Sequence, residues 1–229
     1  MLRRRASAGP PPPGSVRFGD LRRLRPLSER FGFDRGTPID RYYIEDFLSR
    51  HAGDIKGRVL EVGDASYTRR FGVAVTRSDV IDPDESNPHA TIFGDLTSAD
   101  HVASDSFDSV ICTQVLLLIF DVRAALSTLE RILRPGGVLL VTVPGITKVS
   151  RGEAERWGDY WRFTAQSARR LFEEVFPPGE VQVETHGNVL AAVAFLHGMA
   201  AEELSREELD AHDPDFEVTV AVRAAKAPA

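Results

Sequence analysis

Apolar positions recur along the chain with a helical spacing in four places. From Thr37 to His51 they fall three or four residues apart on one stripe, after Thr37 and Pro38, which favour a helix start with Thr37 as N-cap and Pro38 as the first helical residue. A second helix follows Asp121 and stops at Pro135-Gly136-Gly137. The remaining predicted helices begin at Thr164 and span residues 188–210.

Short runs rich in β-branched residues lie between these helices and predict strands. The predicted strands are Arg58–Gly63, Val73–Val80, Ala90–Phe93, Phe107–Thr113, Val138–Val143, Val181–Thr185 and, with period 2, Phe216–Val222. Phe107–Thr113 shows no strict alternation and is therefore expected to be central and buried on both faces. Strands that alternate with helices predict an α/β fold with a doubly wound, mostly parallel seven-stranded sheet, helices on both faces and an antiparallel last strand.

Composition fits one globular domain with an arm. The chain has 229 residues, 42% of them hydrophobic and 27% charged, and no apolar run approaches the roughly 18 residues that cross a bilayer. Residues 1–25 hold seven arginines and one aspartate, a net charge of +6, whereas the rest of the chain carries −12. We therefore divide the chain into a disordered basic N-terminal arm at 1–25, an N-terminal helical cap at 26–56 and a sheet domain at 57–225.

The same features limit where the protein works. The N-terminal arginines precede no apolar stretch, so a secretory signal is not expected. The single cysteine, Cys112, lies in an apolar run as a small buried side chain and suits a reducing cytoplasm. We expect a cytoplasmic protein without a membrane partner. The arm is interpreted as a solvated tail, with contact to nucleic acid or another acidic surface as the less favoured alternative, and nothing in the sequence indicates an oligomeric state.

Residues at the carboxyl ends of parallel strands lie where ligands bind in open α/β sheets. Gly63 ends the first strand and permits a positive φ with the backbone open to a ligand, while Glu61 is placed to orient a cationic amine. Asp79 follows Glu61 by 18 residues, close to the roughly 20-residue spacing of an acid that binds a ribose diol. We favour Asp79 for that role over its rival Asp82, because predicted strand ends are uncertain by a few residues.

Together these strand ends resemble those of class I S-adenosylmethionine-dependent methyltransferases of the type 11 group, over roughly Gly57 to Arg223. Val-Leu-Glu61-Val-Gly63 is similar to the start of the family motif E-x-G-x-G-x-G, but Ala65 and Tyr67 stand where the later glycines belong. The segment Leu133-Arg-Pro-Gly-Gly-Val-Leu-Leu-Val is the most specific match and concerns a turn of the fold.

The resemblance implies S-adenosylmethionine as cofactor. It places Asp95 at the adenine amino group, Leu96 against the adenine ring and Gln114 near the methionine moiety. It also implies that the N-terminal helix covers the cofactor, with Tyr42, Tyr43 or Arg35 near the methionine end, although Tyr43 lies on the apolar stripe and suits core packing better.

An aromatic segment, Arg156–Thr164, contains both tryptophans of the chain. It resembles segments of type 11 methyltransferases, including ones that look as if they work beside glycosyltransferases on cell-surface sugars. We assign Trp157, Tyr160, Trp161 and Arg162 to acceptor binding, because flat aromatic faces suit sugar rings and arginine suits hydroxyls or phosphate. The alternative interpretation is that these aromatics anchor a long loop.

The resulting functional hypothesis is methyl transfer to a hydroxyl of a sugar or small metabolite. His186 and Asp159 are the candidate catalytic bases, and no metal-ligand pattern is present, so a metal-independent reaction is expected. Two alternatives stay open. One is a binding module that keeps the fold but has lost catalysis, and the other is a nicotinamide-dependent enzyme, which requires the G-x-G-x-x-G turn that this sequence lacks.

Overall fold

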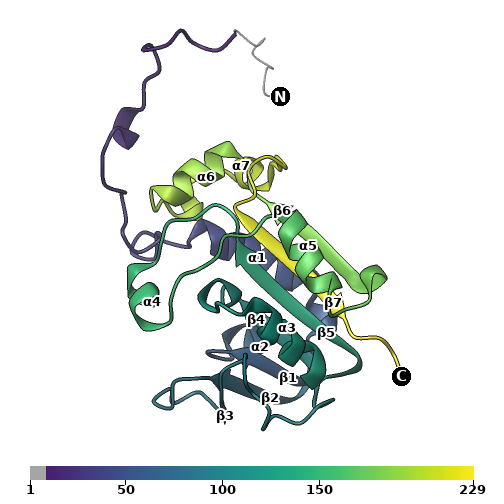
Figure 1. The fold of residues 1–229 in the computed structure, drawn as a ribbon. Helices are drawn as coiled ribbons and strands as arrows, with labels where there is room; N and C mark the ends of the chain where they lie inside the picture. Colours follow the sequence, from purple (N-terminus) through teal and green to yellow (C-terminus); the bar gives the residue numbers. More distant parts are fainter. Residues whose placement is uncertain (1–8) are drawn as a thin grey trace.

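The computed structural model describes residues 9–229, so the first eight residues of the predicted arm lie outside it. Seven strands form one sheet in the order β3-β2-β1-β4-β5-β7-β6 (Figure 1). The strands are β1 (Lys56–Val62), β2 (Ala74–Asp82), β3 (Ile92–Phe93), β4 (Phe107–Thr113), β5 (Leu133–Pro144), β6 (Val181–His186) and β7 (Thr219–Ala225). Strands β1 to β5 pair in parallel, and β7 runs antiparallel between β5 and β6. The predicted doubly wound sheet with an antiparallel last strand is confirmed.

Seven α-helices accompany the sheet within the described residues. They are α1 (Ile39–Arg50), α2 (Ser66–Phe71), α3 (Val122–Ile132), α4 (Arg151–Arg156), α5 (Ala165–Glu173), α6 (Val189–Leu196) and α7 (Arg206–Asp210). Two start as the sequence predicts. The Asp121 carboxylate accepts a hydrogen bond from the Ala124 amide at 3.0 Å, and Thr164 forms a capping box with Ser167 at the start of α5.

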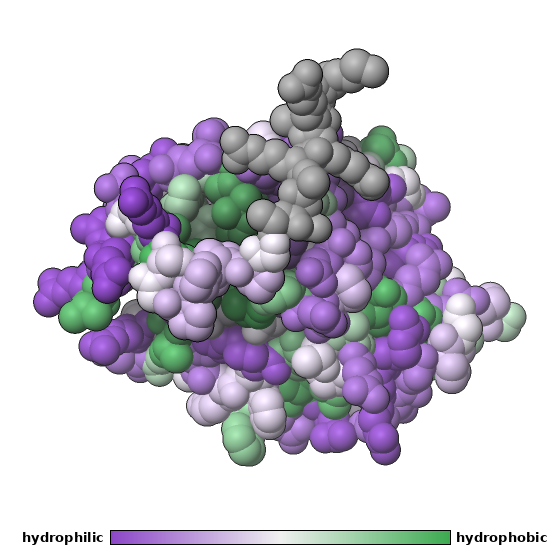
Figure 2. All heavy atoms as spheres, turned by 90° about the horizontal axis from the view of Figure 1, so that it is seen from above, coloured by the Kyte–Doolittle hydropathy of each residue, from purple (hydrophilic) through white to green (hydrophobic). Residues whose placement is uncertain are grey.

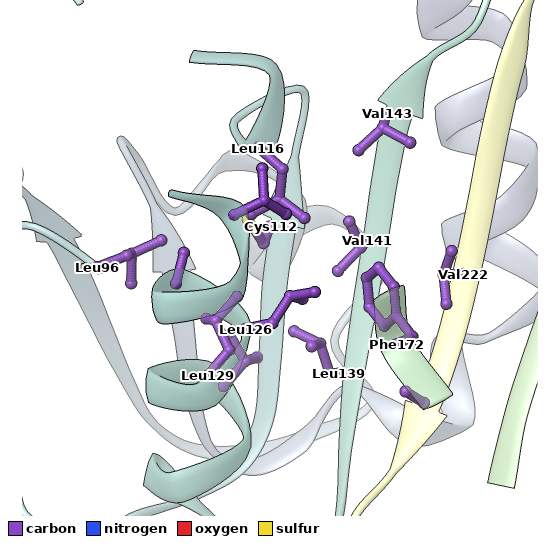
Figure 3. Packing of buried hydrophobic residues seen from close by; sticks show 14 of the residues in the cluster. Leu96, Cys112, Leu116, Leu126, Leu129, Leu139, Val141, Val143, Phe172 and Val222 are labelled. Carbon is purple, nitrogen blue, oxygen red and sulfur yellow. The ribbon is translucent and has the colours of Figure 1, made fainter. Parts of the chain in front are cut away.

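Both faces of the sheet are covered, so most residues of the central strand β4 are buried. On one face, α3 and α5 pack Leu126, Leu129 and Phe172 against β4, β5 and β7 (Figure 3). On the other, α1 and α2 pack against Val59, Ile111 and other residues that alternate with the first set. Cys112 is fully buried in the first cluster, as predicted (Figure 3).

Predicted boundaries differ from the structure mainly at strand and helix ends. β4 matches its predicted range, but β2 continues two residues beyond Val80, to Asp82. The N-cap of α1 is Pro38 rather than Thr37, because the Thr37 backbone N–H and hydroxyl bind the Glu202 carboxylate instead. Residues 188–210 are two helices, α6 and α7, separated by the 3₁₀ turn Ala201–Glu203.

Ahead of α1, the chain runs along the outside of the molecule with one 3₁₀ turn, Gly19–Leu21. It joins the body at Leu27 and Ser28, whose backbone N–H groups donate to the His197 carbonyl at the end of α6. None of the helices in residues 9–229 combines the length and apolar character that a membrane span requires.

Candidate active site

A cavity of about 510 Å³ lies at the carboxyl ends of β1, β2 and β4. We call it the strand-end cavity. Its lining residues come from the strand ends and from two loops: Val62, Gly63, Ile81, Asp82, Pro83, Gly94, Asp95, Leu96, Thr97, Val115, Leu118, Ile119, Phe120, Asp121, Trp157 and Tyr160. Its volume is in the range of pockets that hold cofactor-sized ligands.

Gly63 forms the floor of this cavity at the end of β1. Its φ is +87°, a conformation that L side chains rarely adopt, and a Cβ built on it meets no atom within 4 Å. The backbone of the turn therefore faces open space, as the sequence predicts. A larger residue here both strains the turn and projects into the cavity.

Asp82, not Asp79, is the strand-end acid of β2. Asp82 is half-buried, lines the cavity and accepts hydrogen bonds from the Asp84 amide at 2.8 Å and the Asn87 Nδ2 at 2.7 Å. Asn87 also donates to the Gly63 carbonyl, so it links the ends of β1 and β2. The carboxylate that the sequence prediction placed second therefore has the position expected of a ribose-binding acid.

Asp79 lies away from the cavity, within β2. Its side chain is 2% exposed and forms ion pairs with Arg58 at 2.7 Å and Arg77 at 2.9 Å. Burial acts to raise the pKa of Asp79, but the two guanidinium groups outweigh it and hold the pKa below its ordinary value. The structure thus favours Asp82 over the preferred Asp79 for the ribose role, because β2 ends at Asp82 and Asp79 is already bound within the sheet.

Glu61 also has a role other than the predicted one. Its buried carboxylate accepts the backbone N–H groups of Tyr67 and Thr68, at 3.0 and 2.7 Å, and the Thr68 hydroxyl at 2.7 Å. Burial is the main effect on this group, and it raises the pKa of Glu61 despite these donors. Glu61 thus fastens the start of α2 to β1 and does not line either of the large cavities near the strand ends.

Asp95 and Leu96 lie together at the opposite wall of the strand-end cavity. Asp95 is exposed, and its Oδ1 accepts the Thr97 amide at 2.8 Å, which holds the turn after β3. Leu96 is buried and packs into the main core beneath the cavity (Figure 3). Gly63, Asp82 and Asp95 therefore converge on one space.

A second, larger cavity of about 960 Å³ adjoins the first, with Leu118 lining both. We call it the polar cavity. Its walls are residues 25–33, the start of α1, the end of β4, residues 144–153 and parts of α6 and β7. Asp159 also lines it.

Gln114 lines the polar cavity and not the strand-end cavity. Its φ is +55°, which is uncommon for a residue other than glycine and indicates a constrained turn after β4. The Gln114 Nε2 is buried and has no hydrogen-bond partner in the described chain, and the same is true of the Thr219 hydroxyl on the same cavity. Two unpartnered polar groups at the floor of one cavity are typical of a ligand site.

Asp40 and Arg41 line the polar cavity from the first turn of α1, and the sequence analysis did not single them out. Arg41 donates to the hydroxyl of Tyr67 on α2, and its Cζ lies 5.6 Å from the centre of the Tyr67 ring. The half-buried Asp40 carboxylate accepts one hydrogen bond, from the Arg41 backbone amide at 2.8 Å. Burial raises the pKa of Asp40, with a smaller opposing effect from Arg41.

The signal for these two residues was present in the sequence. They are adjacent charged residues at the start of an amphipathic helix, on the side away from its apolar stripe. Only the fold brings that helix beside the end of β4, more than 70 positions later in the chain.

Asp159 is held by Arg162 in an ion pair that closes the loop after β5. The Asp159 side chain is 1% exposed and accepts the Ser150 amide at 3.0 Å, while Arg162 also donates to the Lys148 carbonyl at 3.0 Å. Arg162 lowers the pKa of Asp159, more strongly than burial raises it. Since a carboxylate in this state is a weak proton acceptor, the geometry favours a loop-fastening role for both residues over the predicted base and acceptor-binding roles.

The predicted aromatic residues divide into two groups. Trp157 and Tyr160 line the strand-end cavity. Trp161 lines neither large cavity, donates its Nε1–H to the Ile119 carbonyl at 3.0 Å and stacks on Phe120 at 5.8 Å between ring centres. Phe120 and Tyr160 are also in edge contact at 5.4 Å, so the segment builds an aromatic wall beside the strand ends.

His186 lies at the same edge of the sheet but in a different, smaller cavity beneath α7. Its ring stacks on Tyr43 at 5.4 Å, and its Nε2 is 3.1 Å from Glu184. The structure thus separates His186 from the strand-end and polar cavities and does not support its predicted catalytic role. The cause is topological, since β7 and β6 follow β5 and carry His186 to the outer edge of the sheet.

The other residues considered for the methionine end are likewise engaged elsewhere. Tyr42 donates to Asp210 at 2.6 Å, the buried Tyr43 donates to the Leu209 carbonyl at 3.0 Å, and Arg35 pairs with Glu203. Tyr43 is therefore a core residue, as its position on the apolar stripe favoured. No group of three or more His, Cys, Asp or Glu side chains within residues 9–229 is arranged to hold a metal ion.

Several known structures share this arrangement of strands and helices. A SAM-dependent methyltransferase from Archaeoglobus fulgidus aligns with a TM-score of 0.54 at 13% identity, over 81% of this chain and 94% of that one. The N-methyltransferase NodS from Bradyrhizobium japonicum, solved with S-adenosyl-L-homocysteine, aligns with a TM-score of 0.54 at 18% identity, over 87% and 94%. The [4+2]-cyclase SpnF aligns with a TM-score of 0.55 at 15% identity, over 85% of each chain.

At these identities the structural likeness establishes the fold, which is shared by a cyclase and by methyltransferases. No curated protein matches the chain in sequence. The family model described as a methyltransferase domain, in contrast, matches residues 35–188, about two thirds of the chain. This range includes α1, with Asp40 and Arg41, and the strands β1 to β6. The chain therefore belongs to the class I S-adenosylmethionine-dependent methyltransferases, with S-adenosylmethionine as its cofactor.

Proposed function

We propose that the protein binds S-adenosylmethionine across the strand-end cavity and transfers its methyl group to a hydroxyl of a sugar or small metabolite held in the polar cavity. One observation carries the proposal. Gly63, Asp82 and Asp95 line a single cavity that adjoins a larger polar one at Leu118. Donor and acceptor thus have separate, neighbouring spaces.

In this proposal, Asp82 accepts the ribose hydroxyl protons, Asp95 accepts from the adenine amino group, and Leu96 packs against the adenine ring. Asp82 suits the role because Asn87 and the Asp84 amide already fix the orientation of its carboxylate. Each carboxylate oxygen retains a further lone pair for a ligand hydroxyl.

The methionine end would lie toward the polar cavity, between α1 and the end of β4. Arg41 is the cation available there for the methionine carboxylate, and the unpartnered Gln114 Nε2 is a second donor. Tyr67 contributes indirectly, because its hydroxyl binds and orients Arg41.

The sulfonium of the bound cofactor supplies an already activated methyl group, so the main task of the protein is to align the acceptor and exclude water. As the acceptor oxygen forms its bond to the methyl carbon and the carbon–sulfur bond breaks, the hydroxyl proton must leave. Asp40 is our candidate for the base that receives it. It faces the polar cavity, has no side-chain donor bound to it, and has a pKa raised by burial toward the range in which a carboxylate accepts a proton effectively.

A second candidate function is a binding module without methyl transfer. Ala65 and Tyr67 favour it, because they occupy positions where the family motif carries glycines. The fold itself does not decide between the two, since it also supports the cyclase SpnF.

Calorimetric titration tests the proposal. We expect micromolar binding of S-adenosyl-L-homocysteine and no binding of NADH. Asp82→Ala should weaken S-adenosyl-L-homocysteine binding by a factor of about 10 to 100, the effect of losing one or two charge-assisted hydrogen bonds. Asp79→Ala is the matched control, three residues away on the same strand, and should keep its affinity wherever it is folded.

Two results would contradict the proposal. Absence of heat with S-adenosyl-L-homocysteine rules out the cofactor site. Binding of the cofactor without transfer of a labelled methyl group to any component of an extract from the source cells favours the binding module.

A further inference from the structure

The polar cavity holds more cationic than anionic groups, although the chain as a whole carries a net charge of −6. Its lining includes five cations and four carboxylates: Arg25, Arg30, Arg41, Lys148, Arg151, Glu29, Asp40, Glu153 and Asp159. One of the carboxylates is already compensated, because Asp159 is paired with Arg162, which is not part of the lining. The remaining groups are five cations against three carboxylates.

Three of these cations have no carboxylate partner. Arg25, Arg30 and Arg151 form no ion pair in the part of the chain that the structure describes, and all three are exposed around the cavity. Elsewhere on the surface, arginines such as Arg123 and Arg134 are paired with Glu174 and Asp108. Unpaired cations around one cavity attract anions and raise their local concentration there.

Lys148 joins the two walls that carry these cations. Its ammonium donates to the Glu29 carbonyl at 2.9 Å and lies 3.7 Å from the centre of the Phe31 ring. Lys148 thereby fastens Glu29 and Phe31 to the loop after β5 at this cavity. Figure 2 shows the molecule from above, with a largely hydrophilic face in which hydrophobic residues gather in smaller groups.

The floor of the cavity provides an independent observation. The Thr219 side chain is fully buried on β7, and its hydroxyl has no hydrogen-bond partner in the described residues, like the Nε2 of Gln114. A buried donor without a partner is costly, and a polar ligand relieves that cost. Gln114 and Thr219 both belong to the lining of the polar cavity.

From these observations we propose that the methyl acceptor is an anionic small molecule, bearing a carboxylate or a phosphate, whose charged group is held by Arg30 and Arg151 and whose polar body lies over Gln114 and Thr219. The inference rests on the proposed function, because it describes the acceptor of the same site. It narrows the acceptor from any sugar or metabolite hydroxyl to a hydroxyl compound with a negative charge. Phe31 and Phe195, which also line the cavity, provide apolar surface for the rest of such a molecule.

The test uses the full chain saturated with S-adenosyl-L-homocysteine. Glucose 1-phosphate, glucuronate and methyl glucoside are titrated separately by calorimetry, at two salt concentrations. We expect one or both anionic sugars to bind at least tenfold more tightly than the neutral one, with affinity that falls as salt rises. The affinities for glucose 1-phosphate and for glucuronate show whether the site prefers a phosphate or a carboxylate.

An Arg30→Gln, Arg151→Gln double variant should reduce the affinity for the preferred anion at least tenfold and leave that for S-adenosyl-L-homocysteine unchanged. Arg206→Gln, on exposed α7, is the control and should change neither. Equal binding of the charged and neutral sugars, no binding of any of them, or an unaltered anion affinity in the double variant overturns the inference. S-adenosyl-L-homocysteine binding is measured first, and absence of that binding counts against the proposed function. In that case the preference for anionic sugars is measured on the protein without S-adenosyl-L-homocysteine, so the two failures are distinguishable.

Discussion

Tyr67 accepts a hydrogen bond from Arg41 at the position where the family motif has its last glycine. The Tyr67 ring is buried against Phe71 and the α1 side of the sheet, and its hydroxyl binds the guanidinium that also lies over the ring. Burial raises the pKa of Tyr67, so the phenol remains neutral. The departure from the glycine motif therefore comes with a new contact that positions a cation at the edge of the polar cavity.

Tyr67→Phe tests this contact. Removing the hydroxyl frees Arg41 to move, so we expect the dissociation constant of S-adenosyl-L-homocysteine to rise by a factor of about 5 to 10, the worth of about one charge-assisted hydrogen bond. Calorimetry measures the affinity, and thermal unfolding verifies the fold. Tyr42, next to Arg41 on α1, lines neither large cavity, and its hydroxyl binds Asp210. Tyr42→Phe is therefore the control and should leave the affinity unchanged. Equal affinities in the two variants would show that Arg41 does not contact the cofactor.

Asp40→Asn tests the proposed base. Once labelled methyl transfer has identified the acceptor, we expect the turnover rate to fall by a factor of about 100 to 10,000, while affinity for S-adenosyl-L-homocysteine changes less than threefold. The pKa of Asp40 is raised, and only the ionised form accepts a proton. The wild-type rate should therefore drop as the pH falls through a value above the ordinary aspartate pKa, and the rate of the variant should lack this step. Asp46→Asn, on the exposed side of α1, is the matched control, and a variant with the wild-type pH profile would exclude Asp40 as the base.

Asp79→Asn should affect stability rather than binding. The folded-state pKa of Asp79 is lowered by Arg58 and Arg77, so its stabilising effect is complete above the unfolded pKa of about 4 and is lost as the pH falls through the folded value. At pH 7 we expect the free energy of unfolding of the variant to be about 1 to 3 kcal/mol lower, because the buried Asp79 loses the charge that binds two partly exposed arginines. Urea unfolding at pH 7 and pH 3 measures this difference, which should shrink at the lower pH. A constant difference would mean that the carboxylate is not responsible.

Cys112 should be unreactive in the folded protein. Burial raises the pKa of its thiol to about 12, and the side chain has no exposed surface, so neither thiolate nor access is available at neutral pH. Ellman's reagent should titrate no thiol in native conditions and one thiol in concentrated urea. Reaction of the native protein within minutes would indicate that the core around β4 opens readily.

Much of the fold could be predicted because its signals are local. The β4 range and the caps at Asp121 and Thr164 depend on runs of a few neighbouring residues, and all three are found in the structure. The end of β2 was mispredicted for a non-local reason. An acid near the end of a predicted strand suggests a ligand-binding position, but Asp79 lies inside β2 and pairs with Arg58, which belongs to a different strand.

The candidate site was predictable only in part for the same reason. Gly63 and Asp95 follow directly from strand ends, whereas Asp40 and Arg41 reach the site through the packing of α1 against the sheet. His186 has the right strand-end position, but the strand order moves it to another cavity. Spacing along one strand predicts an edge of the sheet; it does not predict which part of that edge surrounds the ligand.

The carboxylate of Glu61 also determines what the first turn is unable to bind. A dinucleotide cofactor rests its pyrophosphate on free amide donors at the start of the helix after the first strand. Here Tyr67 and Thr68 direct those amides at a side chain of their own protein, and a pyrophosphate approaching that helix would meet bound donors and a nearby negative group. We therefore expect the turn to disfavour phosphate-bridged nucleotides, in keeping with the proposed cofactor, whose nucleoside carries no phosphate.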